Sequence, residues 1–171
     1  MVLMISMEKF LDYVIRKHTG QKRDEGTMYV THPISVAMIL ARKGYSDEYI
    51  AVALGHDLIE DTDATYDEIT DLTNEDIADA ILALSKPAHN VDYKKYYSGI
   101  ANLEIARAVK VADRIHNLST MASGGWSKKR QQKYLDKTKE YIFPLAEQGS
   151  TGNLYGDLHE VYVSVARIIG E

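Results

Sequence analysis

Apolar residues in this chain recur at intervals of three and four positions almost throughout, which is the spacing of one face of an α-helix. In the first such segment, Phe10, Val14 and His18 fall at i, i+4 and i+8. The alternation of apolar and polar residues that is typical of a strand is found nowhere, and only 3 prolines interrupt the 171 residues. The sequence therefore predicts an all-α protein.

Turn and capping signals divide this pattern into helices, with no linker, repeat or low-complexity tract between them. Thr31 is expected to cap a helix with Pro33 in its first turn, and Ser46 to cap the next, which continues through Leu58. Residues 88–99 suit either a helix or a packed loop. The other predicted helices are one that ends near Gly20, a short one from Thr65 or Asp67, and those at 74–84, 102–120, 126–146 and 154–169. We expect residues 1–171 to form a single compact helical bundle.

Charge and cysteine content exclude several classes of protein. The 25 acidic and 20 basic residues give a net charge of −5, so we expect no nucleic-acid partner, because duplex binding requires many cations against phosphates. The absence of cysteine excludes disulfides, thiolate ligands and thiol nucleophiles. The apolar run Met1–Met7 is short and has no basic residue before it, so we expect neither a signal peptide nor a membrane span. These features are typical of a cytoplasmic protein.

Four ionisable residues crowd the segment His56-Asp57-Leu58-Ile59-Glu60-Asp61 in an otherwise apolar helix. On a helix, His56 and Glu60 are neighbours at i and i+4, as are Asp57 and Asp61. Such a cluster is compatible with surface charges or ordinary hydrogen bonds. Clustered carboxylates repel one another unless a cation holds them, so the same residues also indicate a cation site.

A second polar cluster lies on a later helix, where Lys110, Asp113 and Asn117 fall at i, i+3 and i+7 among apolar residues. These side chains are compatible with caps and interhelical hydrogen bonds. An aspartate close to the core nevertheless requires a partner, and a metal ion is one candidate. Together with His32, the two clusters offer two imidazoles and two carboxylates, a set that suits Mn²⁺, Fe²⁺, Co²⁺ or Zn²⁺. Spacing alone leaves both interpretations open.

Three segments in this order resemble the HD superfamily of metal-dependent phosphohydrolases, whose signature is His…His-Asp…Asp. Segment 18–33, His56–Thr62 and Val111–Leu118 resemble the three motifs of the RelA/SpoT hydrolase domain. Segment 125–134 extends the similarity to the small alarmone hydrolases and the metazoan SpoT homologue. The resemblance implies one HD-type hydrolase domain over residues 1–171.

The resemblance also implies a role for each matching residue. The ligands of a single ion, usually Mn²⁺, fall at His32, His56, Asp57 and Asp113. Glu60 and Asp61 match the acidic pair that positions the attacking water and handles protons. Substrate contacts fall at Arg23, Asn117, Arg130 and Tyr134. The implied reaction removes the 3′-pyrophosphate of guanosine 3′-diphosphate 5′-di- or triphosphate ((p)ppGpp), giving GDP or GTP and pyrophosphate.

A polyanionic substrate requires local cations on an acidic protein. The basic clusters in the sequence are Lys22–Arg23, Lys94–Lys95 and the group Lys128, Lys129, Arg130 and Lys133. From the second of these clusters, Lys94 and Lys95 are predicted to contact the substrate. The other histidines have simpler interpretations: His18 is predicted to be structural or to support a ligand, His116 to face away from Asp113, and His89 and His159 to lie on the surface.

The segment after Arg23 departs from the family pattern. Asp24 and Glu25 stand where the family often has a lysine and a small residue, and Met28 stands where proline is common. Two carboxylates beside a base pocket repel a polyphosphate or accept hydrogen bonds from a different base. One alternative is therefore an HD-type phosphohydrolase acting on another nucleotide, such as an adenine alarmone, NADPH or a nucleoside monophosphate. A second alternative is a non-catalytic nucleotide sensor. The oligomeric state is left open.

Overall fold

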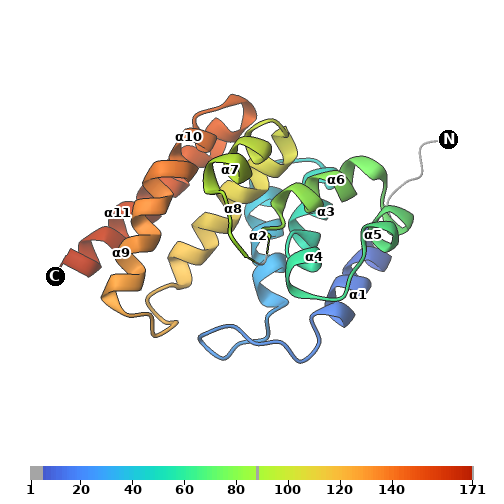
Figure 1. Cartoon of the computed structure of the whole chain (residues 1–171), viewed down its shortest axis with the longest axis horizontal. Helices are drawn as coiled ribbons and strands as arrows, with labels where there is room; N and C mark the ends of the chain where they lie inside the picture. The colour runs from blue at the N-terminus through green and yellow to red at the C-terminus, as the bar shows by residue number, and fades with distance from the viewer. Residues whose placement is uncertain (1–5, 88, 171) are drawn as a thin grey trace.

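The computed structural model describes residues 6–87 and 89–170, and within these ranges it contains helices and no strand (Figure 1). The predicted all-α class is confirmed. Lys22 and Met28 form an isolated β-bridge within the loop that joins the first two helices. Most of the apolar run Met1–Met7, for which we expected no membrane span, lies outside the described residues. In the part that is described, no helix is both long and apolar enough to cross a membrane.

The helices are short, apart from two long ones near the middle and the end of the chain. In order they are α1 (Met7–Lys17), α2 (Thr31–Arg42), α3 (Asp47–Gly55), α4 (Leu58–Asp61), α5 (Tyr66–Leu72), α6 (Glu75–Leu84), α7 (Tyr93–Ala101), α8 (Glu104–Thr120), α9 (Lys128–Lys137), the π-helical turn η1 (Thr138–Ile142), α10 (Phe143–Ala146), the 3-10 turn η2 (Gly149–Thr151) and α11 (Gly152–Gly170).

Helix α8 is the central element of the bundle. It packs against α2, α3, α6 and α7 on one side and against α10 and α11 on the other, and Figure 1 shows these two groups of helices on either side of it. Val109, Val111 and Ala112 of α8 are fully buried. Removing one such valine side chain from water contributes about 1.5–3 kcal/mol to folding. This packing fixes the position of any polar side chain that α8 carries.

The helix predicted to continue through Leu58 instead ends at Gly55, and α4 begins at Leu58 after two intervening residues. Close packing explains why α3 requires glycine at its end. A Cβ atom on Gly55 would lie 2.6 Å from Cδ1 of Ile81 and 2.9 Å from Cζ of Phe10, which is too close for either contact. The break leaves His56 and Asp57 between two helices, so the expected single helix is wrong. The expected pairing of Asp57 and Asp61 is kept, because the Asp61 N–H donates to the Asp57 carbonyl oxygen at 2.9 Å.

Other helix boundaries confirm or correct the predicted caps. Thr65 and Glu68 form a capping box at the start of α5, and the Asn74 side chain accepts a hydrogen bond from the first turn of α6. Asn102 ends α7 rather than starting α8, and Thr31 is the first residue of α2 rather than its cap. The predicted helix 126–146 is divided, because it begins at α9 and then widens into the π-helical turn η1. The ambiguous segment 88–99 contains most of α7.

Candidate active site

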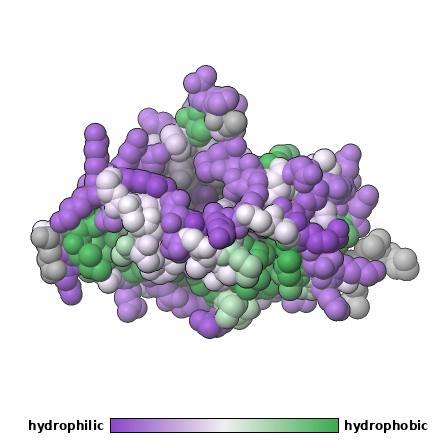
Figure 2. Space-filling model, turned by 90° about the horizontal axis from the view of Figure 1, so that it is seen from below, coloured by the Kyte–Doolittle hydropathy of each residue, from purple (hydrophilic) through white to green (hydrophobic). Residues whose placement is uncertain are grey.

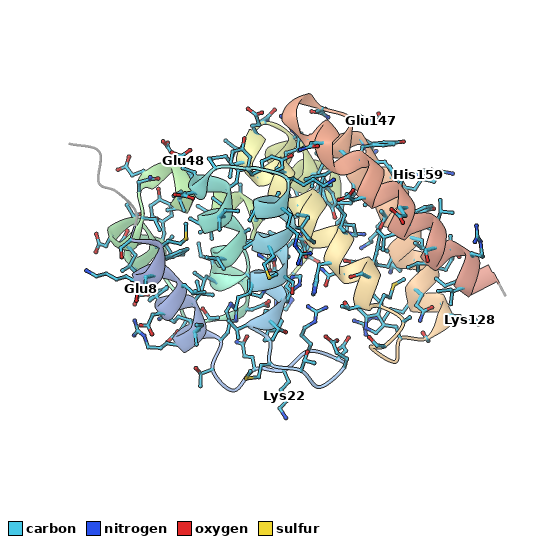
Figure 3. The ribbon with its side chains drawn as sticks, turned by 180° about the vertical axis from the view of Figure 1, so that it is seen from behind. Glu8, Lys22, Glu48, Lys128, Glu147 and His159 are labelled. Atoms are coloured by element: carbon cyan, nitrogen blue, oxygen red, sulfur yellow. The ribbon has the colours of Figure 1, made fainter. Side chains whose placement is uncertain are left out.

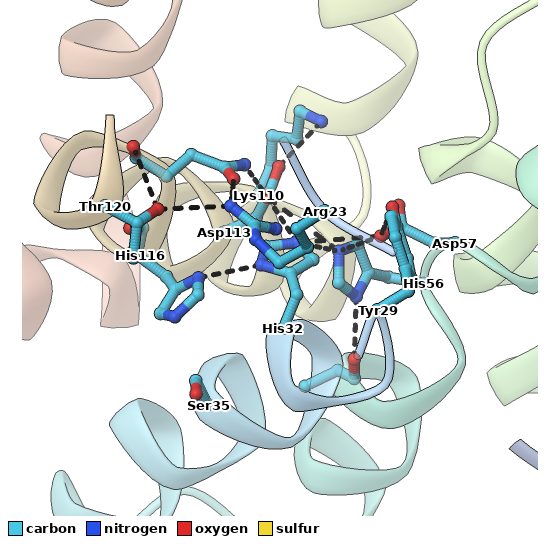
Figure 4. A network of polar contacts seen from close by, with 12 residues as sticks. Arg23, Tyr29, His32, Ser35, His56, Asp57, Lys110, Asp113, His116 and Thr120 are labelled. Atoms are coloured by element: carbon cyan, nitrogen blue, oxygen red, sulfur yellow. Dashed lines mark hydrogen bonds and ion pairs between the residues drawn. The ribbon is translucent and has the colours of Figure 1, made fainter. Parts of the chain in front are cut away.

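Four side chains that are far apart in the sequence meet where α2, α3 and α8 come together (Figure 4). His32 lies in the first turn of α2, His56 and Asp57 lie at the break between α3 and α4, and Asp113 lies in the middle of α8. Both imidazoles and Asp113 are buried, and Asp57 is largely so. We call these residues the four-residue cluster.

The distances within the four-residue cluster suit one shared ion. The Nε2 atoms of His32 and His56 lie 3.2 Å apart. Oδ2 of Asp57 lies 3.1 Å from His56 Nε2 and 3.6 Å from His32 Nε2, while Oδ1 of Asp113 lies 3.1 Å from His32 Nε2. Ligands bound about 2.1 Å from a common ion are about 3 to 4 Å from one another. One ligand atom from each of His32, His56 and Asp113 falls within 4.8 Å of the other two, as such a site requires.

The protonation of the imidazoles also favours a cation between them. His56 Nδ1 lies 2.7 Å from the carbonyl oxygen of Ala53, which can only accept, so this nitrogen carries a hydrogen. In the neutral ring, the lone pair of Nε2 therefore faces His32 Nε2. Burial alone would lower the pKa of His56, but the carboxylates of Asp57 and Asp113 raise it to about 9. Either a proton or a metal ion is thus required at this nitrogen.

The two carboxylates of the cluster stay ionised despite their burial. Burial acts to raise the pKa of Asp57, but the adjacent His56 imidazolium holds it below its usual range. Asp113 behaves in the same way, because Lys110 Nζ lies 3.0 Å from its Oδ2 and keeps its pKa low. Asn117 donates a further hydrogen bond of 2.5 Å to Oδ1 of Asp113. The cluster therefore presents two anionic oxygens to a cation.

Tyr29 connects the four-residue cluster to one member of the predicted acidic pair. Its hydroxyl lies 2.8 Å from Oδ2 of Asp57 and 2.8 Å from Oδ2 of Asp61. Partial burial raises the pKa of Asp61, which makes this carboxylate a better proton acceptor. The buried ring of His18 stacks on Tyr29 with centroids 5.0 Å apart, and its Nδ1 is 2.8 Å from Oε1 of Gln21. His18 lies outside the cluster and supports Tyr29.

The other acidic residue, Glu60, is held by a lysine that the sequence analysis missed. Lys86 Nζ lies 2.5 Å from Oε1 of Glu60, and the Lys86 backbone N–H donates to Oε2 at 3.0 Å. Both carboxylate oxygens of Glu60 are therefore engaged. Lys86 follows the last turn of α6, in a polar segment without helical periodicity, so its sequence context does not indicate a role.

A cavity of about 280 Å³ lies beside the cluster and is lined by the loop between α1 and α2, the end of α8 and the start of α9. We call it the outer cavity. Arg23 crosses it: Nη2 donates to Asn117 Oδ1 at 3.0 Å and to Thr120 Oγ1 at 3.1 Å, and Nε donates to Glu25 Oε1 at 2.7 Å. Figure 2 shows hydrophilic residues around a recess on the face seen from below. Glu25 thus neutralises Arg23, which is predicted to contact the substrate.

Asp24, another departure from the family pattern, connects two residues that line the outer cavity. Oδ2 of Asp24 accepts a hydrogen bond of 2.5 Å from Trp126 Nε1 and lies 3.1 Å from Nη2 of Arg130. The Arg130 guanidinium also stacks on Trp126, 3.7 Å from the ring centroid. Tyr134, a predicted substrate contact, also lines this cavity.

A second cavity of about 260 Å³, the catalytic cavity, joins the outer cavity at Arg23, Tyr29, Asn117 and Tyr134. It contains most of the four-residue cluster and the acidic pair. Lys94 and Lys95 do not line either cavity, because both are exposed on α7. The basic residues that do line the catalytic cavity are Arg23, Lys86, Lys110, Arg114 and Lys137. Residues 88–99 suit either a helix or a loop in the sequence, so the sequence does not indicate which way Lys94 and Lys95 point.

The remaining histidines differ in position. His116 does not face away from the site, since its Nδ1 lies 2.8 Å from Nδ1 of His32. The helix turns about 300° between Asp113 and His116, so the two side chains are on neighbouring faces, and α2 covers both. His89 is exposed, as predicted. His159 is also exposed, on the outer side of α11, where it stacks on Tyr155 (Figure 3).

Comparison with known proteins places this geometry in a family. The HD domain matches residues 11–96, half of the chain. The chain belongs to the HD domain family. An HD domain implies a divalent metal ion, and the two imidazoles and two carboxylates of the four-residue cluster fit that ion.

Individual relatives carry more specific names. The bifunctional (p)ppGpp synthase/hydrolase SpoT of Escherichia coli is 32% identical over 154 residues, which cover 84% of this chain and 22% of the relative. The guanosine-3′,5′-bis(diphosphate) 3′-pyrophosphohydrolase of Aquifex aeolicus is 30% identical over 90% of this chain and 23% of its own length. The chain thus spans about a fifth of these curated relatives. The solved structure of a metazoan orthologue of SpoT that hydrolyses ppGpp superposes with a TM-score of 0.80 and 26% identity, covering 92% of this chain and 93% of the other.

Proposed function

We propose that this HD domain, acting as one unit over residues 1–171, hydrolyses the 3′-pyrophosphate of (p)ppGpp with Mn²⁺ as its ion. The observation that carries the proposal is the meeting of His32, His56, Asp57 and Asp113 at one point, where all of them except His56 line the catalytic cavity. The names of the HD relatives and of the superposing metazoan hydrolase support the substrate. Imidazole and carboxylate ligands together suit Mn²⁺.

In this proposal the acidic pair divides two tasks. A divalent ion, when bound, makes the attacking water more acidic and stabilises negative charge on the phosphoryl oxygens. Asp61 accepts the proton of that water, because burial raises its pKa even though the hydrogen bond from the Tyr29 hydroxyl acts to lower it. Glu60 is held in place by Lys86. Each of its carboxylate oxygens keeps a second lone pair, which can accept a hydrogen bond from the water and orient it. The Tyr29 hydroxyl contacts both Asp57 and Asp61, so it fixes the position of Asp61 relative to the proposed ligand Asp57.

The outer cavity then holds the nucleoside. The guanidinium of Arg23 is fixed by Glu25, Asn117 and Thr120, so its flat face is presented for stacking on a base. Asn117 bonds both Arg23 and Asp113, which connects the nucleoside position to the cluster. Arg130 and Tyr134 line the far wall.

A second candidate function keeps the ion and changes the nucleotide. Glu25 removes the net charge of Arg23, and Asp24 adds a carboxylate at the cavity mouth. Both features repel a polyphosphate, so they favour a nucleotide with fewer phosphates at this cavity than (p)ppGpp has. Rates on ppGpp, on an adenine alarmone, on NADPH and on nucleoside monophosphates separate the two candidates.

The test is release of pyrophosphate from ppGpp by the purified protein with Mn²⁺. Asp57→Ala is expected to abolish release while the helical circular dichroism spectrum is unchanged, since Asp57 lies between helices. Asp71→Ala, at an exposed carboxylate of α5, is the matched control and should retain the wild-type rate. Turnover that survives the loss of Asp57 refutes the proposed site. Tight ppGpp binding without turnover in any divalent metal identifies a sensor instead.

A further inference from the structure

The cations of the catalytic cavity fall into two groups. Three of them are neutralised by a carboxylate: Arg23 by Glu25 at 2.7 Å, Lys86 by Glu60 at 2.5 Å and Lys110 by Asp113 at 3.0 Å. For the other two, Arg114 and Lys137, no carboxylate of the described chain lies within ion-pair distance. A cavity wall with two unpaired cations is suited to an anionic ligand.

Arg114 is the more unusual of the two, because its side chain is only 4% exposed. Its Nη1 donates to Oγ1 of Thr138 at 2.7 Å and to the backbone oxygen of Tyr134 at 3.2 Å, and Nη2 lies 3.5 Å from the hydroxyl of Tyr97. All of these partners are neutral, and Nε has no partner among the described residues. Burying a charge without a counter-ion is costly, so an arginine in this position indicates a ligand that supplies the negative charge.

Lys137 lines the same cavity as Arg114. It is the last residue of α9, and its Nζ lies 3.7 Å from the centroid of the Tyr93 ring. The π-helical turn η1 begins at the next residue, Thr138, which also holds Arg114. Wide turns of this kind are frequent at functional sites, where they redirect a side chain. Tyr97, which lines the same cavity, stacks on Tyr141, with ring centroids 4.6 Å apart.

We propose that Arg114 and Lys137 form an anion subsite for a phosphate group of the substrate that the metal ion does not hold. The inference rests on the proposed function and extends it to a second phosphate. Both residues line the catalytic cavity and not the outer cavity, so the subsite is separate from the nucleoside position. Two substrate phosphates share this chemistry: the distal phosphate of the 3′-pyrophosphate and those of the 5′ chain. A phosphate dianion neutralises both cations.

The test measures binding of the two products separately, by calorimetry on the metal-loaded protein after free metal has been removed. Inorganic pyrophosphate reports on the 3′ group, and GDP reports on the 5′ chain. Lys137→Gln is expected to raise the dissociation constant of one of them about tenfold, the usual effect of losing one charge-assisted contact. A rise for pyrophosphate assigns the subsite to the leaving group, and a rise for GDP assigns it to the 5′ chain.

Lys133→Gln is the matched control, because Lys133 lies one turn earlier on α9, is exposed and lines neither cavity. It removes the same charge from the same helix and should leave both constants unchanged. Arg114→Lys keeps the charge but loses the fork of donors, and it should weaken the same product that Lys137→Gln weakens. If both constants for Lys137→Gln stay within twofold of those for Lys133→Gln, the subsite is refuted. A wild-type protein that binds pyrophosphate through Lys137 but releases none from ppGpp refutes the proposed function and retains the subsite.

Discussion

His32 and His116 meet nitrogen to nitrogen, with their Nδ1 atoms 2.8 Å apart. Burial, together with the positive charges of His32 and Arg23, lowers the pKa of His116 to about 4, so this ring is neutral at physiological pH. A His32 ring that ligates an ion through Nε2 carries its hydrogen on Nδ1 and donates it to His116. The second ring therefore fixes both the tautomer and the orientation of the first.

His116→Phe should weaken metal binding, because it removes the acceptor that orients His32 while it keeps a ring of similar size. Loss of such a supporting hydrogen bond costs about 10- to 100-fold in metal affinity. The measurement is a competition titration of Mn²⁺ against a chelator. His116→Asn retains an acceptor and should recover part of the loss, whereas His159→Phe, on the surface of α11, should have no effect. Equal affinity in His116→Phe and the wild type would contradict this role.

Metal binding should release a proton. The carboxylates near buried His56 raise its pKa to about 9, so without an ion the ring is protonated at neutral pH, and an ion at Nε2 must displace that proton. Affinity is therefore expected to rise as the pH increases towards 9 and to level off above it. Calorimetry in two buffers of different ionisation enthalpy counts the protons released, and about one is expected near pH 7. A release of zero, with affinity independent of pH, would show that His56 is not a ligand.

The sequence predicts much of this site because its signals are local or chemically unusual. The helical period and the helix starts near Thr65 and Asn74 are set within a few residues, and in the structure both residues cap the helices that follow them. The four side chains of the cluster, on α2, at the break between α3 and α4, and on α8, carry no common local spacing. Their role was implied by family resemblance, and the structure brings all four together.

What the sequence does not show depends on contacts between elements. The approach of Ile81 and Phe10 is what requires glycine at position 55, and no local pattern records it. His116 was misplaced because its partner lies on α2, 84 positions away in the chain. Lys94 and Lys95 are predicted to contact the substrate because they form a basic pair in the sequence. The catalytic cavity is lined instead by single basic residues from different elements, such as Lys86 and Lys137.

Acid should destabilise the protein partly through Glu68. Its Oε2 accepts a hydrogen bond of 2.9 Å from the Thr65 backbone and one of 3.0 Å from the Tyr13 hydroxyl. The Thr65 backbone bond is the main cause that lowers the pKa of Glu68 from 4.5 to about 2. A lowered pKa means that this stabilisation is complete above about pH 4.5 and is lost as the pH falls towards 2.

Urea denaturation at several pH values tests the effect of Glu68. Glu68→Gln should be less stable than the wild type at neutral pH, and the difference should shrink as the pH is lowered from about 5 to 2. Glu48→Gln, an exposed position in the first turn of α3, is the control and should follow the wild type. A difference between Glu68→Gln and the wild type that stays constant over this pH range would contradict the assignment.

Asp24 should limit substrate binding at the mouth of the outer cavity. Its carboxylate occupies Arg130 and places a negative charge where a polyphosphate enters, although both side chains are about half exposed. Asp24→Asn keeps an acceptor for Trp126 and removes the charge, so KM for ppGpp is expected to fall about two- to fivefold at low salt, the range of an exposed ion pair. The effect should disappear at high salt, because exposed charges are screened, and kcat should be unchanged. Asp71→Asn, far from both cavities, is the control. A rise in KM would instead show that Asp24 binds the substrate itself, as expected for a carboxylate that accepts hydrogen bonds from the donor edge of guanine.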